Sequence, residues 1–184
     1  MTGTSPSAAL ADRAARITLV LFDVDGVLTD GHVILHGDGT ESKAFFIRDG
    51  IAMVWAQRMG LTVGLLSARM SPTTAQRAAQ LGITLVYQVP NKLATYEQIL
   101  REVGVRDDQV AYMGDDILDL GVLARVGLSA APADAVEDVR DRVHWVASLA
   151  GGQGAARELL EVILRAQDKW DGLVASFIPT PERA

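Results

Sequence analysis

The chain has 184 residues, of which 49% are apolar and 22% are charged, and this composition predicts one soluble globular domain and excludes a disordered chain. The formal net charge of −6 disfavours nucleic acid or an anionic membrane surface as a partner, and the absence of cysteine excludes disulfides, thiolate catalysis and zinc-thiolate sites. No apolar run is long enough for a signal peptide or a membrane span, so we expect a cytoplasmic protein.

The first predicted strand covers residues 17–22, after a flexible terminus over residues 1–8 and a short helical segment. It is apolar and rich in β-branched residues, and it stops at Asp23 and Asp25. Residues i and i+2 of an extended segment face the same side, and Gly26 lets the backbone turn away, so both carboxylates should face one crevice. Such a pair suits a divalent cation and a reaction in which one carboxylate attacks while the other transfers a proton.

A β-hairpin is predicted next, because two β-rich runs in residues 32–47 flank the turn signal Asp38-Gly39. A helix should begin at Asp49 and end at Gly60. Strand and helix patterns then alternate, with strands over 61–66, 83–88, 109–114, 127–131 and 143–147, and helices over 72–82, 91–103, 117–125, 134–141 and 155–170. This alternation predicts an α/β fold with a doubly wound, mostly parallel sheet. We expect a single domain over residues 9–170 and a flexible tail over 171–184.

Polar side chains follow several of these predicted strands. Ser67 and Arg69 come after strand 61–66, Lys92 follows strand 83–88, and strand 109–114 leads to Asp115, with Asp116 and Asp119 behind it. Right-handed crossovers bring such ends to one edge of a parallel sheet, beside Asp23 and Asp25. An acidic metal-binding cluster flanked by a hydroxyl and an ammonium group suits a phosphoryl group.

The runs FDVDGVLTD, LLSAR at 65–69, Lys92 and GDDILD at 114–119 resemble the four motifs of the haloacid dehalogenase superfamily, in the same order and across most of the chain. The resemblance implies a Rossmann-like core in which Asp23 is the nucleophile that forms an aspartyl-phosphate and Asp25 is the general acid and base. It also implies that Ser67 and Lys92 hold the phosphoryl group. Mg²⁺ would be ligated by the carboxylates of Asp23 and Asp115 and by the backbone carbonyl of Asp25.

The spacing of the motifs leaves no room for a cap domain. The hairpin, FFIRDG at 45–50 and GGQGAARE at 151–158 resemble those of the capless 3-deoxy-D-manno-octulosonate 8-phosphate phosphatases and their sialic-acid-pathway relatives. This resemblance implies a homotetramer in which a neighbour's hairpin helps to shape each site. It places a further group of residues on the sugar acid, beside Asp25 and Lys92: Arg48, Asp49, Gly50, Arg69, Arg77 and Arg157. Guanidinium groups suit a carboxylate-bearing substrate because their fork matches its two oxygens.

The expected function is Mg²⁺-dependent hydrolysis of a phosphorylated 3-deoxy-2-ulosonic acid, with 3-deoxy-D-manno-octulosonate 8-phosphate as the first candidate. Three departures from the family pattern, at Phe46, Ala68 and Asn91, leave 2-keto-3-deoxynononate 9-phosphate or a sialic acid 9-phosphate as an alternative. From another class, a phospho-receiver signalling module also has an acidic metal site, but its phosphorylated aspartate stands on a middle strand, and strand 83–88 ends without one. An inactive scaffold is a third alternative, against which the intact acidic set argues.

Overall fold

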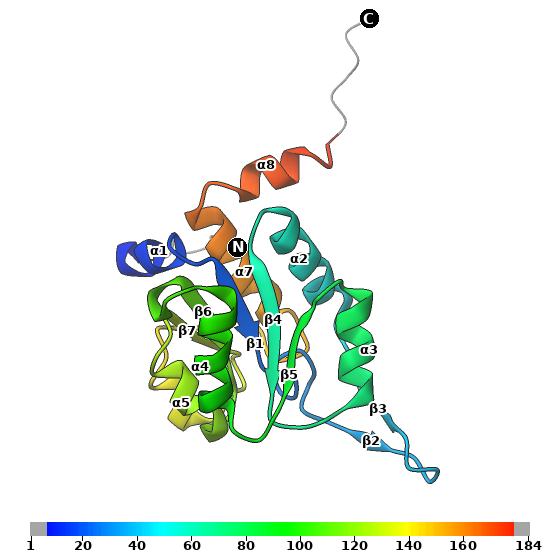
Figure 1. The fold of residues 1–184 in the computed structure, drawn as a ribbon. Coiled ribbons are helices and arrows are strands. Elements are labelled where there is room, and N and C mark those ends of the chain that lie inside the picture. The colour runs from blue at the N-terminus through cyan, green and yellow to red at the C-terminus, as the bar shows by residue number, and fades with distance from the viewer. Residues whose placement is uncertain (1–6, 179–184) are drawn as a thin grey trace, which may run out of the picture.

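Six parallel strands form the centre of the computed structural model, which describes residues 7–178 (Figure 1). Their order across the sheet is β5-β4-β1-β6-β7-β8, and every neighbouring pair is parallel. The strands are β1 (Leu19–Phe22), β4 (Thr62–Ser67), β5 (Leu85–Gln88), β6 (Val110–Met113), β7 (Leu128–Ala131) and β8 (Trp145–Val146). Because the chain first adds strands on one side of β1 and then on the other, the sheet is doubly wound, which confirms the predicted fold class.

Helices cover both faces of this sheet. One core cluster joins the sheet to α1 (Ala8–Ala14), α2 (Ile47–Arg58), α3 (Pro72–Gln80), α7 (Ala155–Ala166) and α8 (Trp170–Ala175). The opposite cluster joins it to α4 (Lys92–Val103), α5 (Leu120–Leu123) and α6 (Glu137–Arg140). Side chains of β1 alternate between the two clusters, as the pleat of a strand requires. Among residues 7–178, no helix has the length and apolar character needed to cross a membrane.

The predicted hairpin is present and projects away from the body of the molecule (Figure 1). Its strands are short, β2 (Ile34–Leu35) and β3 (Glu41–Ser42), and they pair antiparallel in a sheet of their own. The turn forms as its sequence predicts, because Asp38 Oδ1 accepts the Thr40 N–H at 2.9 Å and Gly39 adopts a φ of 84°. The hairpin is the one insertion between β1 and α2, and no cap domain stands among the described residues.

Three predicted segments differ from the structure. The helix predicted over 117–125 is a 3-10 turn, Ile117–Asp119, followed by the single-turn α5, because the Asp119 side chain folds back onto the loop that precedes it. The flexible tail predicted from residue 171 is wrong for residues 171–175, which belong to α8. Trp170 and Leu173, three residues apart, bury one face of α8, and the Trp170 ring lies 6.3 Å from that of Trp55. The flexible terminus predicted over 1–8 is likewise wrong for Ser7 and Ala8, which cap and open α1, and the flexibility predicted for 1–6 and 179–184 concerns positions outside the described residues.

Candidate active site

A cavity of about 280 Å³ lies at the carboxyl-terminal edge of the sheet, where the sequence predicts the polar cluster. The loops after β1, β4 and β6 and the start of α4 form its walls. Its lining contains six predicted site residues and their neighbours: Asp23, Asp25, Gly26, Gly31, Ser67, Ala68, Arg69, Lys92, Asp115, Asp116, Leu118 and Asp119. The structure therefore brings the four motif segments together in one chain.

Asp23 and Lys92 form a buried ion pair at the centre of this cavity. Asp23 directly follows β1, and Lys92 opens α4, where the Asn91 side chain caps the helix by accepting the Ala94 N–H at 3.1 Å. Lys92 Nζ lies 2.8 Å from Asp23 Oδ2. Burial and the neighbouring carboxylate of Asp119 raise the pKa of Asp23 to about 6, and the Lys92 ammonium opposes this rise. The lysine therefore favours the ionised form that a carboxylate nucleophile needs.

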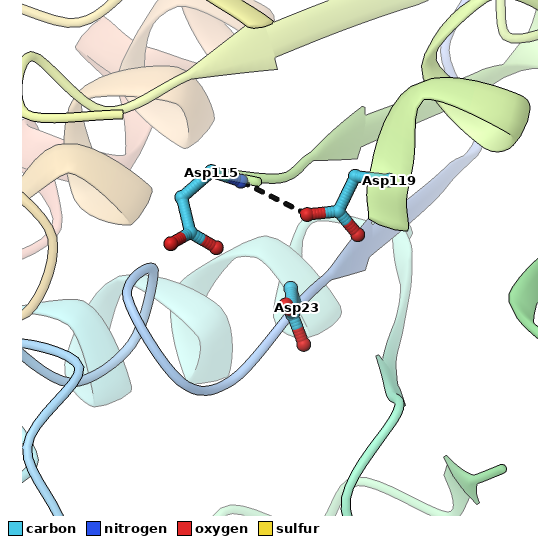
Figure 2. A group of neighbouring side chains, drawn as sticks. All are labelled: Asp23, Asp115 and Asp119. Atoms are coloured by element: carbon cyan, nitrogen blue, oxygen red, sulfur yellow. Dashed lines mark hydrogen bonds between the residues drawn. The ribbon is translucent and has the colours of Figure 1, made fainter. Parts of the chain in front are cut away.

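Asp119 holds this arrangement together, although the sequence analysis assigned it no role. Its Oδ1 lies 2.6 Å from Lys92 Nζ and accepts the Tyr112 hydroxyl at 2.5 Å. Its Oδ2 accepts the N–H of Asp115 at 3.0 Å (Figure 2) and the N–H of Asp116 at 3.2 Å. The GDDILD spacing contained the signal, because a carboxylate four residues after Asp115 can return to the loop's N–H groups. Asp119 thus positions both the lysine and the loop that carries Asp115.

Carboxylate oxygens of Asp23, Asp115 and Asp119 lie within 4.8 Å of one another (Figure 2). Both oxygens of Asp119 have partners, and those of Asp23 contact the Val24 N–H and Lys92, whereas the Asp115 carboxylate has no hydrogen bond or ion pair among residues 7–178. Burial, followed by the charges of Asp23 and Asp119, raises the pKa of Asp115 to about 7. Three carboxylates around one ammonium leave an excess of negative charge, and this all-oxygen donor set fits a hard divalent cation such as Mg²⁺.

Gly26 brings Asp115 against the turn that follows Asp25. A Cβ atom on Gly26 would lie 2.0 Å from Asp115 Oδ2, and Gly26 has a φ of 84°. Only glycine permits both this close approach and this backbone conformation. The carboxylate of Asp115 and the backbone beside Asp25 are therefore neighbours, as the predicted metal site requires.

Ser67 and Arg69 form the wall contributed by the β4 loop. Ser67 is the last residue of β4 and is buried, and its hydroxyl accepts the Arg69 N–H at 3.3 Å. The Arg69 guanidinium forms an ion pair with Glu41 of the hairpin, and Glu41 also accepts the Ser71 hydroxyl. The hairpin is therefore fastened to the loop that carries Ser67.

Asp25 has a charged partner that the sequence analysis missed. Lys43, just after β3, places its Nζ 2.6 Å from Asp25 Oδ1, and the lysine side chain is completely buried. Nothing in the local sequence distinguishes Lys43 from a surface lysine, because the contact depends on how the hairpin folds back onto the β1 loop. The pair joins the hairpin to the second catalytic carboxylate that the resemblance implies.

The other predicted substrate residues do not line this cavity. Arg48 and Arg157 lie on a separate hollow of about 550 Å³, together with Phe46 and Leu149. The Arg157 guanidinium stacks on Trp55, 5.1 Å from the ring centre. Within one chain, these arginines and the aspartate cluster are thus in different places.

Asp49, Gly50 and Arg77 lie in the packing between helices. Asp49 is buried, and its Oδ1 accepts the N–H of Arg157 at 2.9 Å at the start of α7. A Cβ atom on Gly50 would lie 2.3 Å from an Arg77 guanidinium nitrogen. The Arg77 guanidinium in turn lies 5.8 Å from the centre of the Phe45 ring. A role for these residues on the sugar acid remains a prediction.

Comparison with known proteins places the chain in a family. The profile of the haloacid dehalogenase-like hydrolases matches residues 55–159. The 3-deoxy-D-manno-octulosonate 8-phosphate phosphatase of Yersinia pestis is 42% identical over 161 residues, which are 87% of this chain and 86% of that protein. The phosphatase of the same name from Escherichia coli K12 is 40% identical over 90% of this chain and 88% of its own.

Solved structures agree with these sequence relatives. The crystal structure of the 3-deoxy-D-manno-octulosonate 8-phosphate phosphatase from Moraxella catarrhalis, in complex with magnesium ion, phosphate ion and KDO, matches with a TM-score of 0.91 at 31% identity, covering 94% of this chain and 100% of that one. That from Yersinia pestis matches with a TM-score of 0.88 over 90% of both chains. The chain therefore belongs to the haloacid dehalogenase-like hydrolases, in the family of the 3-deoxy-D-manno-octulosonate 8-phosphate phosphatases.

Proposed function

We propose that this protein is a Mg²⁺-dependent phosphatase that removes phosphate from 3-deoxy-D-manno-octulosonate 8-phosphate through an aspartyl-phosphate intermediate. The observation that carries the proposal is the buried Asp23–Lys92 pair beside Asp115, at the strand end where the family places its nucleophile. Relatives that are 40 to 42% identical to this chain are named 3-deoxy-D-manno-octulosonate 8-phosphate phosphatases. A receiver module is not supported, because β5 ends at Gln88 without an aspartate and the chain belongs to a hydrolase family.

The reaction assigns one task to each residue at the strand ends. An oxygen of Asp23 attacks phosphorus, the bond from phosphorus to the sugar oxygen breaks, and Asp25 gives its proton to the leaving alkoxide. A water then attacks the aspartyl-phosphate, Asp25 takes the proton from that water, and phosphate leaves Asp23. Ser67 and Lys92 bind the phosphoryl oxygens, with the Lys92 ammonium countering their charge.

Mg²⁺ would be held by the carboxylates of Asp23 and Asp115 and the backbone carbonyl of Asp25. When bound, this ion neutralises charge on the phosphoryl oxygens and helps to align them with Asp23. The excess negative charge of the aspartate cluster supports its presence, since a buried group of carboxylates is costly without a cation.

The sugar acid would be bound by the remaining predicted residues in an oligomer. Arg69 lines the aspartate cavity of its own chain, whereas Arg48, Asp49, Gly50, Arg77 and Arg157 lie elsewhere, which supports a site completed by a neighbouring copy. The hairpin residues Ile34 and Leu35 are 62% and 75% exposed, and apolar exposure of this kind favours self-association. We infer a homotetramer in which a neighbour's hairpin shapes each site.

The test is phosphate release with Mg²⁺ and with EDTA from the eight-carbon and nine-carbon ulosonic acid phosphates and from simple hexose phosphates. The Asp23→Asn variant serves as the blank. Mg²⁺-dependent preference for the eight-carbon substrate, lost in the variant, is the expected result. Preference for a nine-carbon substrate would overturn the substrate assignment, and equal release by wild type and variant would overturn the mechanism.

A further inference from the structure

The second strand of the hairpin reaches both catalytic loops. Glu41, in β3, pairs with Arg69 and accepts the Ser71 hydroxyl on the loop after β4. Lys43, two residues later, pairs with Asp25 on the loop after β1. Positions i and i+2 of an extended segment point the same way, so both side chains face the same edge of the sheet. The contacts of Glu41 therefore also place Lys43.

The ion pair between Lys43 and Asp25 is buried, although Lys43 directly follows the hairpin strand β3. The Lys43 side chain is 0% exposed, and its Nζ lies 2.6 Å from Asp25 Oδ1. Among residues 7–178, neither Lys43 Nζ nor Asp25 Oδ1 has a hydrogen-bond partner of regular geometry. The contact between these two atoms is therefore an ion pair without a regular hydrogen bond. Burying two charges is costly, and a pair of this kind contributes more to a defined arrangement than to stability.

The two oxygens of Asp25 have different surroundings. Oδ1 is buried against Lys43, whereas the Asp25 side chain as a whole is 24% exposed and lines the aspartate cavity. The exposed part of the carboxyl group is thus on the side away from Lys43. Lys43 holds one oxygen from behind and leaves the other facing the cavity, where a leaving group or a water would lie.

We propose that Lys43 is a positioning residue that fixes the carboxyl group of Asp25 for proton transfer, an inference that rests on the proposed function of this site. In the first step, the Asp23–phosphorus bond forms, the bond to the leaving oxygen breaks, and a proton moves from the free oxygen of Asp25 to that leaving oxygen. In the second step, water attacks phosphorus, the bond to Asp23 breaks, and the proton of the water returns to Asp25. Lys43 keeps its protons throughout and acts only through Asp25.

Leaving groups of different basicity give the test, because an acidic leaving group needs little help from a general acid. Lys43→Met should slow single-turnover release of phenol from phenyl phosphate, and kcat for the eight-carbon sugar acid phosphate, roughly 100-fold, the loss typical of a misplaced catalytic group. In single turnovers, release of 4-nitrophenol from 4-nitrophenyl phosphate, which reports the first step alone, should slow by less than about 3-fold, because this leaving group does not need the proton of Asp25 and the phosphoryl site is intact. Lys43→Arg, which keeps a cation in place, should recover most of the lost activity.

Single-turnover release of phenol and of 4-nitrophenol slowed by the same factor would overturn the proposal, and so would a rise in KM at constant kcat. An arginine variant no better than the methionine variant would do the same. Lys43→Gln, which keeps an N–H donor, serves as a second variant if the methionine substitution lowers the amount of folded protein. Wild type that hydrolyses both aryl phosphates but not the sugar acid phosphate would refute the proposed substrate alone, since the aryl pair still tests Lys43.

Discussion

Asp49 lies in the first turn of α2 and caps α7 from outside that helix. Its Oδ1 accepts the Arg157 N–H at 2.9 Å, whereas the N-cap residue Gly154 has no side chain for this purpose. Asp49 is only 2% exposed, and burial raises the pKa of its carboxyl from 3.8 to about 6 against the opposing effect of the Arg157 and Gly154 N–H groups. The structure thus assigns Asp49 a measurable effect on stability.

The sign of its pH dependence follows from proton binding. A carboxyl group with a raised pKa binds more protons in the folded than in the unfolded state, so its contribution destabilises the fold increasingly as pH rises through the range between the two pKa values. The rise of the Asp49 pKa from 3.8 to about 6 lowers the free energy of unfolding by roughly 3 kcal/mol above pH 7. About half of this loss is already present at pH 5. Asp49→Asn keeps the Oδ1 acceptor and removes the charge.

We therefore expect the free energy of unfolding of Asp49→Asn, relative to wild type, to rise by about 1.5 kcal/mol between pH 5 and pH 8. Asp49→Ala, which loses the cap, should be about 1 kcal/mol less stable than Asp49→Asn at both pH values. Urea unfolding followed by tryptophan fluorescence, at one protein concentration, measures both differences. Asp171→Asn, on a side chain that is 98% exposed, is the matched control. A difference between Asp49→Asn and wild type that stays constant with pH would refute the reasoning.

Three further predictions concern the site and its surroundings. Gly151→Ala should lower kcat at least about 10-fold in steady-state assays, because its Cβ would lie 1.9 Å from the Gly26 carbonyl oxygen and push on the loop of Asp25; unchanged kcat would show that this loop tolerates the shift. Mg²⁺ at 100 times its Kd should stabilise the fold by about 2.7 kcal/mol in thermal unfolding, and Asp115→Asn should abolish most of this gain; an equal gain in the variant would exclude Asp115 as a ligand. Replacing both Ile34 and Leu35 by lysine should lower the mass found by light scattering from about four times 19.7 kDa, and an unchanged tetramer would exclude the hairpin tip from the interface.

Much of the catalytic half of the site could be predicted from the sequence. The apolar run before Asp23 predicts a buried strand, and alternating strands and helices predict a parallel sheet. Together these two patterns bring Ser67, Lys92 and Asp115 to the same edge, and the structure places them around one cavity. These inferences succeed because parallel strands joined by right-handed crossovers must place their carboxyl ends at the same edge of the sheet.

The tertiary structure alone decided which side chains touch across elements. The pairing of Lys43 with Asp25 depends on how the hairpin folds back, and the bonds of Asp119 depend on the tight turn before α5. Asp49, whose contact with the sugar acid stays a prediction, caps α7, more than a hundred residues away in the sequence. Such contacts produce no periodic pattern and no local bias in composition in the sequence, because they arise from the packing of distant segments. The sequence by itself thus determined the fold class and the chemistry of the strand ends, whereas the residues that orient that chemistry emerged only from the folded arrangement.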